Sequence, residues 1–123
     1  MIIPSPLKKG DTIGVVSTAR KISPEELKPA IDLFESWGLC VELGKNTFKE
    51  YHQFAGTDNQ RAKDFQEMLE NKKIKAIVCA RGGYGTIRIL DQLDFRPFIK
   101  QPKWVVGYSD VTVLHSHLNT LNI

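Results

Sequence analysis

"IKAIVCA", residues 74–80, is an almost uninterrupted apolar run that ends at the glycine-rich segment "RGGYGT", residues 81–86. A strand this apolar is typical of a parallel sheet, in which helices cover both faces. Three other short apolar runs, at residues 11–19, 39–43 and 103–107, also have the length and residue types of strands. The four runs together predict a single sheet.

Segments with helical patterns alternate with these strands. They occupy residues 23–38, 57–73, 86–94 and 109–121. Ser23 and Glu26 have the spacing of a capping box, and Thr57 and Gln60 repeat it at the start of the second helix. Gly38 can take the left-handed conformation that closes a helix. The alternation predicts a layered α/β fold, flavodoxin-like or Rossmann-like, with a mostly parallel sheet flanked by helices.

The composition is that of an ordinary globular domain. The 123 residues are 41% hydrophobic and 25% charged, with a net charge of +3. Cys40 and Cys79 both lie in apolar runs, which predicts two buried structural thiols. No cysteine or histidine spacing indicates a metal site, so no metal is expected.

The same composition argues against membrane and nucleic-acid partners. No apolar run approaches membrane-spanning length, and the N-terminus lacks the pattern of a signal peptide, so we expect a cytoplasmic setting. The lysines at residues 72–75 have no interleaved aromatic residues, as a nucleic-acid platform would require. These lysines are better interpreted as a solvated face.

Ser109, in "GYSDV", residues 107–111, has two interpretations. It could cap the last helix, because serine is a preferred N-cap residue. It could also be a nucleophile raised on a sharp turn between strand and helix, for which the usual pattern is G-x-S-x-G. Gly107 supplies the first glycine, but Val111 stands where the second is expected.

The "RGGYGT" segment also has several interpretations. It could be a simple flexible turn. It could bind phosphate, which would make the chain a small flavodoxin-like nucleotide- or phosphate-binding module, although Arg88 stands where G-x-G-x-x-G needs its third glycine. A third interpretation is an oxyanion hole, in which the backbone N–H of Asp110 and that of Gly82 or Gly83 hold a developing negative charge.

A serine nucleophile needs a base, and the sequence offers no convincing one. His115 and His117 lie on the helix that Ser109 would open, on the order of 9 to 12 Å along its axis. They are expected to be packing or surface residues, and nothing recommends His52. Asp58 and Asp110 are expected to cap helices rather than orient a base, so the triad is incomplete within residues 1–123.

Four segments in order resemble the N-terminal half of the LD-carboxypeptidase family. They are "PLKKGDTIGVVSTA", "FAGTDNQRAKDFQEML", "KAIVCARGGYGTIRILDQLD" and "KWVVGYSDVTVLH". These serine peptidases, also called muramoyltetrapeptide carboxypeptidases, include the microcin C immunity peptidases among their relatives. The resemblance implies a Ser-Glu-His triad without metal or cofactor that releases the terminal D-alanine of cytoplasmic murein tetrapeptides during cell-wall recycling.

The resemblance also implies roles for residues of this chain. The family's nucleophile matches Ser109, and its oxyanion donors match the backbone of Asp110 and the pair Gly82–Gly83, of which Gly83 is favoured. Tyr84 is expected to contact the murein peptide substrate.

The family's glutamate and histidine come from a C-terminal domain that has no counterpart here. Residues 1–123 are therefore expected to be the N-terminal, nucleophile-bearing domain and to be inactive alone, and the full-length protein is expected to be a homodimer. Two alternatives stay open at this point: the nucleotide- or phosphate-binding module, and a non-catalytic regulatory domain.

Overall fold

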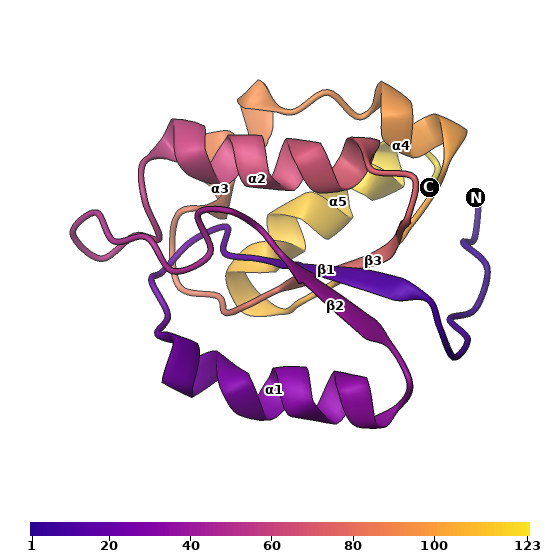
Figure 1. The fold of residues 1–123 in the computed structure, drawn as a ribbon. Helices are drawn as coiled ribbons and strands as arrows, with labels where there is room; N and C mark the ends of the chain where they lie inside the picture. Colours follow the sequence, from indigo (N-terminus) through magenta and orange to yellow (C-terminus); the bar gives the residue numbers. More distant parts are fainter.

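The fold is built on one four-stranded sheet in which all neighbouring strands are parallel. A computed structural model describes residues 1–123. Its strands are β1 (Thr12–Val16), β2 (Cys40–Leu43), β3 (Ile74–Cys79) and β4 (Trp104–Val106). Their order in the sheet is β2-β1-β3-β4 (Figure 1). This is the flavodoxin-like order, and the predicted α/β fold with a parallel sheet is confirmed.

Helices cover both faces of the sheet. They are α1 (Pro24–Ser36), α2 (Asp58–Glu70), α3 (Thr86–Ile89), α4 (Arg96–Lys100) and α5 (Thr112–Thr120), with 3₁₀ turns η1 (Leu90–Gln92) and η2 (Ser109–Val111). The first helix, α1, lies alone on one face and the other four on the opposite face (Figure 1). Right-handed crossovers require this, because the chain moves one way from β1 to β2 and the other way to β3 and β4. None of the helices has both the length and the apolar character needed to cross a membrane.

The two predicted capping boxes are confirmed. Ser23 Oγ accepts the Glu26 N–H, and Glu26 Oε1 accepts the Ser23 N–H, both at 3.1 Å. Thr57 and Gln60 make the same pair of bonds at 3.2 and 3.0 Å. Gly38 has φ +85° just after α1 ends, as expected for a residue that closes a helix.

The segment between β3 and β4 forms several short helices instead of the single helix predicted. The helix expected over residues 86–94 is the short α3 followed by η1, and α4 was not predicted. Pro97 lies in the first turn of α4, and Asp94 Oδ1 accepts the Arg96 N–H at 3.0 Å. These start signals are local, but five residues are too few to show helical periodicity.

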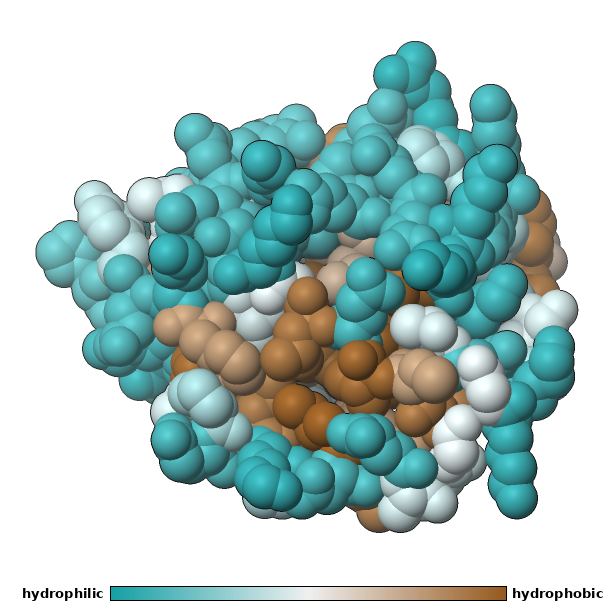
Figure 2. All heavy atoms as spheres, viewed as in Figure 1, coloured by the Kyte–Doolittle hydropathy of each residue, from teal (hydrophilic) through white to brown (hydrophobic).

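The larger part of the core lies between the sheet and helices α2 to α5. Phe65, Ile77 and Leu114 are completely buried there. Cys79 belongs to this core, as predicted, but the prediction for Cys40 is wrong, because β2 is an edge strand and its thiol is exposed. Figure 2 shows apolar side chains gathered in the middle of the face on which β2 lies in Figure 1.

Candidate active site

Ser109 follows β4 at the carboxyl end of the sheet, where ligands bind in parallel α/β folds. Its side chain is exposed and its backbone has φ +61°, the left-handed region that residues other than glycine seldom adopt. Such a conformation costs on the order of 1–3 kcal/mol and is concentrated at functional sites. The strained turn places the hydroxyl at the surface.

The N-cap interpretation of Ser109 is wrong. Tyr108 is the N-cap of η2 and Val111 that of α5, and neither helix start receives a side-chain cap bond. An N-cap residue typically has extended backbone, as Tyr108 does, whereas the backbone of Ser109 is left-handed. Ser109 instead begins η2 as its first residue.

The incomplete match to G-x-S-x-G has a structural explanation. Val111, which replaces the second glycine, is 1% exposed and packs into the core beneath the turn. A Cβ at Gly107 would lie 2.7 Å from Val111 Cγ1, too close for any real contact. Gly107 thus provides the space that allows Val111 to fill the inside of the turn.

The glycine-rich loop, residues 81–85, lies against this turn. A Cβ at Gly82 would be 3.5 Å from Ser109 Cβ and 3.7 Å from the Asp110 backbone nitrogen. Gly83 has φ +110°, and a side chain there would overlap that of Arg20. The structure therefore brings Ser109, Asp110 and Gly82 together, with Gly83 next to them.

Two tyrosines flank the same region. Tyr84, expected to contact substrate, is half exposed, and its ring centroid is 6.4 Å from that of Phe54. Tyr108, which sequence reasoning did not single out, is 81% exposed immediately before Ser109. The substrate role of Tyr84 stays a prediction.

The Asp110 side chain caps a helix, as predicted, but not its own. Its Oδ2 accepts the backbone N–H of Thr86, the first residue of α3, at 3.0 Å. Thr86 Oγ1 also lies 2.8 Å from Thr18 Oγ1, in the loop after β1. The loops after β1, β3 and β4 are thereby joined. A phosphate bound by "RGGYGT" would need N–H groups at this helix start, and a carboxylate already occupies one, which does not favour the phosphate-binding interpretation.

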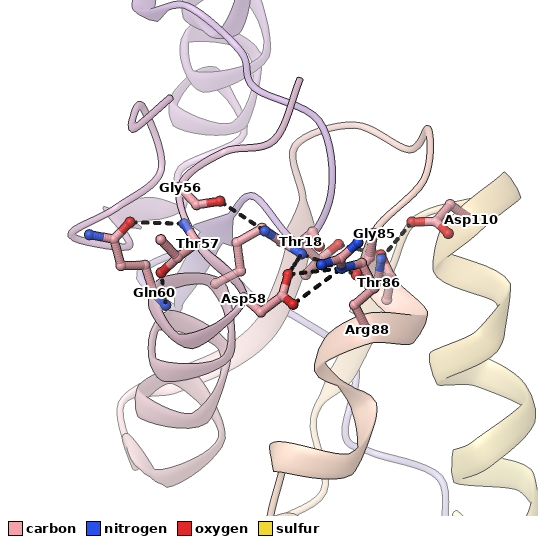
Figure 3. Close-up of polar contacts among 10 residues, drawn as sticks. Thr18, Gly56, Thr57, Asp58, Gln60, Gly85, Thr86, Arg88 and Asp110 are labelled. Carbon is pink, nitrogen blue, oxygen red and sulfur yellow. Dashed lines mark hydrogen bonds and ion pairs between the residues drawn. The ribbon is translucent and has the colours of Figure 1, made fainter. Parts of the chain in front are cut away.

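Sequence reasoning missed a buried arginine beside these loops. The Arg61 guanidinium donates to the backbone carbonyls of Thr18 (3.0 Å), Gly56 (2.8 Å) and Gly85 (3.3 Å). Figure 3 labels these three acceptor residues and Asp58. Backbone carbonyls leave no residue signature, so only the pairing of an arginine with Asp58 three residues earlier could have signalled the network.

Asp58 does not cap α2 with its side chain, contrary to expectation. Its Oδ1 accepts from Arg61 Nη2 at 2.7 Å, and both its oxygens accept from Arg88 Nε at 3.1 Å. Partial burial acts to raise the pKa of Asp58, but the hydrogen bonds from the two arginines outweigh it and lower that pKa. Asp58 is therefore held as a carboxylate between the two guanidinium groups.

His115 and His117 contact other groups, as expected for packing residues. His115 Nε2 lies 3.0 Å from the Val105 carbonyl oxygen, and the His117 ring packs on Phe95 with centroids 5.0 Å apart. His52 is exposed in the loop before α2. None of the three is engaged as a base for Ser109.

A comparison with known protein families decides the relationship. The model of the LD-carboxypeptidase N-terminal domain matches residues 13–123. The chain belongs to the LD-carboxypeptidase family. A probable murein peptide carboxypeptidase of Bacillus subtilis is 43% identical to it over 119 residues. A murein tetrapeptide carboxypeptidase of Pseudomonas aeruginosa is 31% identical over 105 residues.

The fold of this LD-carboxypeptidase domain is also found in solved structures. The wild-type apo structure of the microcin C7 self-immunity protein MccF matches with a TM-score of 0.87 at 31% identity, over 93% of this chain and 35% of that one. The match to the Bacillus subtilis relative spans 95% of this chain but 37% of the relative's length. The match to the Pseudomonas aeruginosa relative spans 85% of this chain but 34% of the relative's length. It thus corresponds to about a third of these relatives.

Cys79 ends β3 at the same edge of the sheet as Ser109. Burial raises the pKa of the Cys79 thiol to about 12, against a weaker opposing hydrogen bond from Thr18, so the thiol keeps its proton. No three His, Cys, Asp or Glu side chains lie together in a group that could hold a metal ion.

Proposed function

We propose that this domain carries the nucleophile and the oxyanion hole of a cytoplasmic serine carboxypeptidase that releases the terminal D-alanine of murein tetrapeptides. The observation that carries the proposal is the exposed Ser109, held at φ +61° beside Gly82 and the Asp110 backbone nitrogen. The names of the Bacillus subtilis and Pseudomonas aeruginosa relatives support the substrate class.

In the proposed reaction, Ser109 Oγ attacks the carbonyl carbon of the amide bond before D-alanine while a base takes the hydroxyl proton. The carbonyl oxygen becomes negatively charged, and the backbone N–H groups of Asp110 and of Gly82 or Gly83 stabilise it. The intermediate collapses to an ester on Ser109, and the amine of D-alanine leaves with a proton from the base. Water then hydrolyses the ester and restores the hydroxyl.

The base is proposed to lie outside residues 1–123. The resemblance implies a glutamate and a histidine from a C-terminal domain, and the histidines of α5 are bound elsewhere. Because a serine without its base is a weak nucleophile, residues 1–123 alone are predicted to be inactive. A homodimer of the complete protein is likewise a prediction.

The test measures D-alanine release from a murein tetrapeptide by the complete protein that carries this domain. Ser109→Ala should abolish turnover, whereas Ser116→Ala, which removes an exposed hydroxyl from α5, should leave it unchanged. Full turnover by Ser109→Ala would rule out the assignment of the nucleophile. Measurable turnover by residues 1–123 alone would rule out the proposed location of the base.

A further inference from the structure

We infer that Arg61 is a positioning residue of this active site, which fixes the glycine-rich loop, residues 81–85, against the turn that presents Ser109. The inference rests on the proposed function of Ser109. It assigns to α2, a helix that contributes no atom to the proposed chemistry, the task of placing the oxyanion donors.

Arg61 is buried, yet its hydrogen bonds are directed at loops rather than at the core. Arg61 is 1% exposed and lies in the first turn of α2. Side chains of a helix lean toward its N-terminus, which here directs Arg61 toward the loops. The three carbonyls that it binds belong to three separate segments: Thr18 after β1, Gly56 before α2, and Gly85 after β3. Burying a guanidinium is costly unless its donors are satisfied, and here all the acceptors lie at the edge that carries Ser109.

The plane of the guanidinium is fixed from two sides. Asp58 accepts from Nη2, and the Phe54 ring lies against the group with its centroid 4.8 Å from Cζ. The second guanidinium, that of Arg88, lies 5.2 Å from the same ring and bonds the same carboxylate. A planar fork held in this way keeps its N–H groups aimed at fixed points.

A single peptide group connects Arg61 to the proposed oxyanion hole. The peptide bond between Gly85 and Thr86 offers its carbonyl oxygen to Arg61 and its N–H to the Asp110 carboxylate (Figure 3). Because a peptide group is planar and rigid, fixing its oxygen also fixes the direction of its N–H. Asp110 in turn supplies one proposed oxyanion donor from its own backbone.

The fit around Gly85 leaves this peptide little freedom. Gly85 is buried with φ +142°, and a Cβ there would lie 3.1 Å from the Phe54 ring and 3.2 Å from Ala19 Cα. If the grip of Arg61 is loosened, we expect the loop to lose its fixed position at Gly85. The distances from Gly82 and Gly83 to Ser109 would then vary.

The test compares Arg61→Lys with the unchanged complete protein. Lysine keeps the charge but is a point donor that cannot reach three carbonyls in one plane. We expect kcat for D-alanine release to fall on the order of 100-fold, since a displacement of about 1 Å can cost that much. KM should change less than about threefold, because the substrate-binding surface is intact.

A second readout and a second variant separate positioning from folding. Amide hydrogen exchange at residues 82–86 should become about tenfold faster in Arg61→Lys. Asp58→Asn, which keeps the three carbonyl bonds but removes the charge that orients them, should speed exchange at the same amides. The control is Leu39→Ala, a buried residue just before β2 that clusters with Ile13 and Ala76, away from the carboxyl end of the sheet. It should lower the melting temperature and leave kcat and these amides unchanged.

Unchanged kcat and unchanged exchange in Arg61→Lys would overturn the inference. Losses of kcat in Arg61→Lys and Leu39→Ala that simply follow their unfolded fractions would also overturn it. If Ser109→Ala retained turnover, the proposed function would fail, but the exchange rates would still decide the positioning role. If Ser109→Ala were inactive while Arg61→Lys turned over normally, only the role of Arg61 would fail.

Discussion

The carboxylate of Asp110, the residue after Ser109, accepts the backbone N–H of Thr86 at 3.0 Å and so caps the start of α3. Two segments 24 residues apart in sequence are joined by this bond. It places the glycine-rich loop and the serine turn in one hydrogen-bonded unit.

Asp110→Ala should destabilise the domain by about 1–3 kcal/mol, because it leaves the N–H of the completely buried Thr86 without a partner. Asp110→Asn keeps a hydrogen-bond acceptor and should therefore destabilise the domain less than Asp110→Ala does. Urea unfolding of residues 1–123 measures both. Equal stability of Asp110→Ala and the unchanged domain would show that this bond does not hold the loop.

Lys103 gives a prediction on pH. It is buried, its Nζ donates to the carbonyls of Asn71 and Ile74 at 2.6 Å, and burial, with a smaller contribution from Lys75, lowers the pKa of Lys103 to about 8. The unfolded chain keeps the ordinary pKa of about 10.5, so it binds more protons than the folded chain between pH 8 and 10.5. Lys103 should therefore make the free energy of unfolding rise with pH through this window.

The check is urea unfolding at several pH values from 7 to 10 for the unchanged domain and Lys103→Met. The raised pKa of Cys79 acts in the opposite direction above about pH 9, but it is common to both proteins and cancels in their difference. The unfolding free energy of the unchanged domain minus that of Lys103→Met should increase as the pH rises. A constant difference would mean that Lys103 titrates normally.

Gly107→Ala should destabilise the domain by roughly 1–3 kcal/mol, because its Cβ would overlap Val111. Val111→Ala alone should also destabilise, since it leaves a cavity in the core. The double variant should recover part of the sum, because the smaller residue makes room for the new methyl group. Strict additivity of the two losses would contradict the packing described for this turn.

The elements that could be predicted from the sequence are those that local patterns determine. The capping boxes of Ser23 and Thr57 depend on residues three apart, so their geometry follows from spacing. The convergence of the loops after β1, β3 and β4 follows from parallel strands, whose carboxyl ends share one edge.

The features that escaped prediction depend on distant contacts. Arg61 binds backbone carbonyls up to 43 residues away, and any residue type could provide them. The exposure of Cys40 depends on which strand lies at the edge, which its own apolar run does not specify. Ser109 has left-handed backbone in a turn where Gly107 leaves room for the buried Val111, whereas the sequence alone equally allowed a cap.

The identity of the serine that reacts with an acylating reagent decides whether Ser109 is the nucleophile. The complete protein would be treated with a fluorophosphonate, which modifies activated serines, and the adduct located by peptide mass spectrometry. We expect one adduct, on Ser109, that is absent from residues 1–123 alone and reduced at least tenfold in Arg61→Lys. An adduct on another serine, or an active protein in which Ser109 stays unmodified, would contradict this expectation.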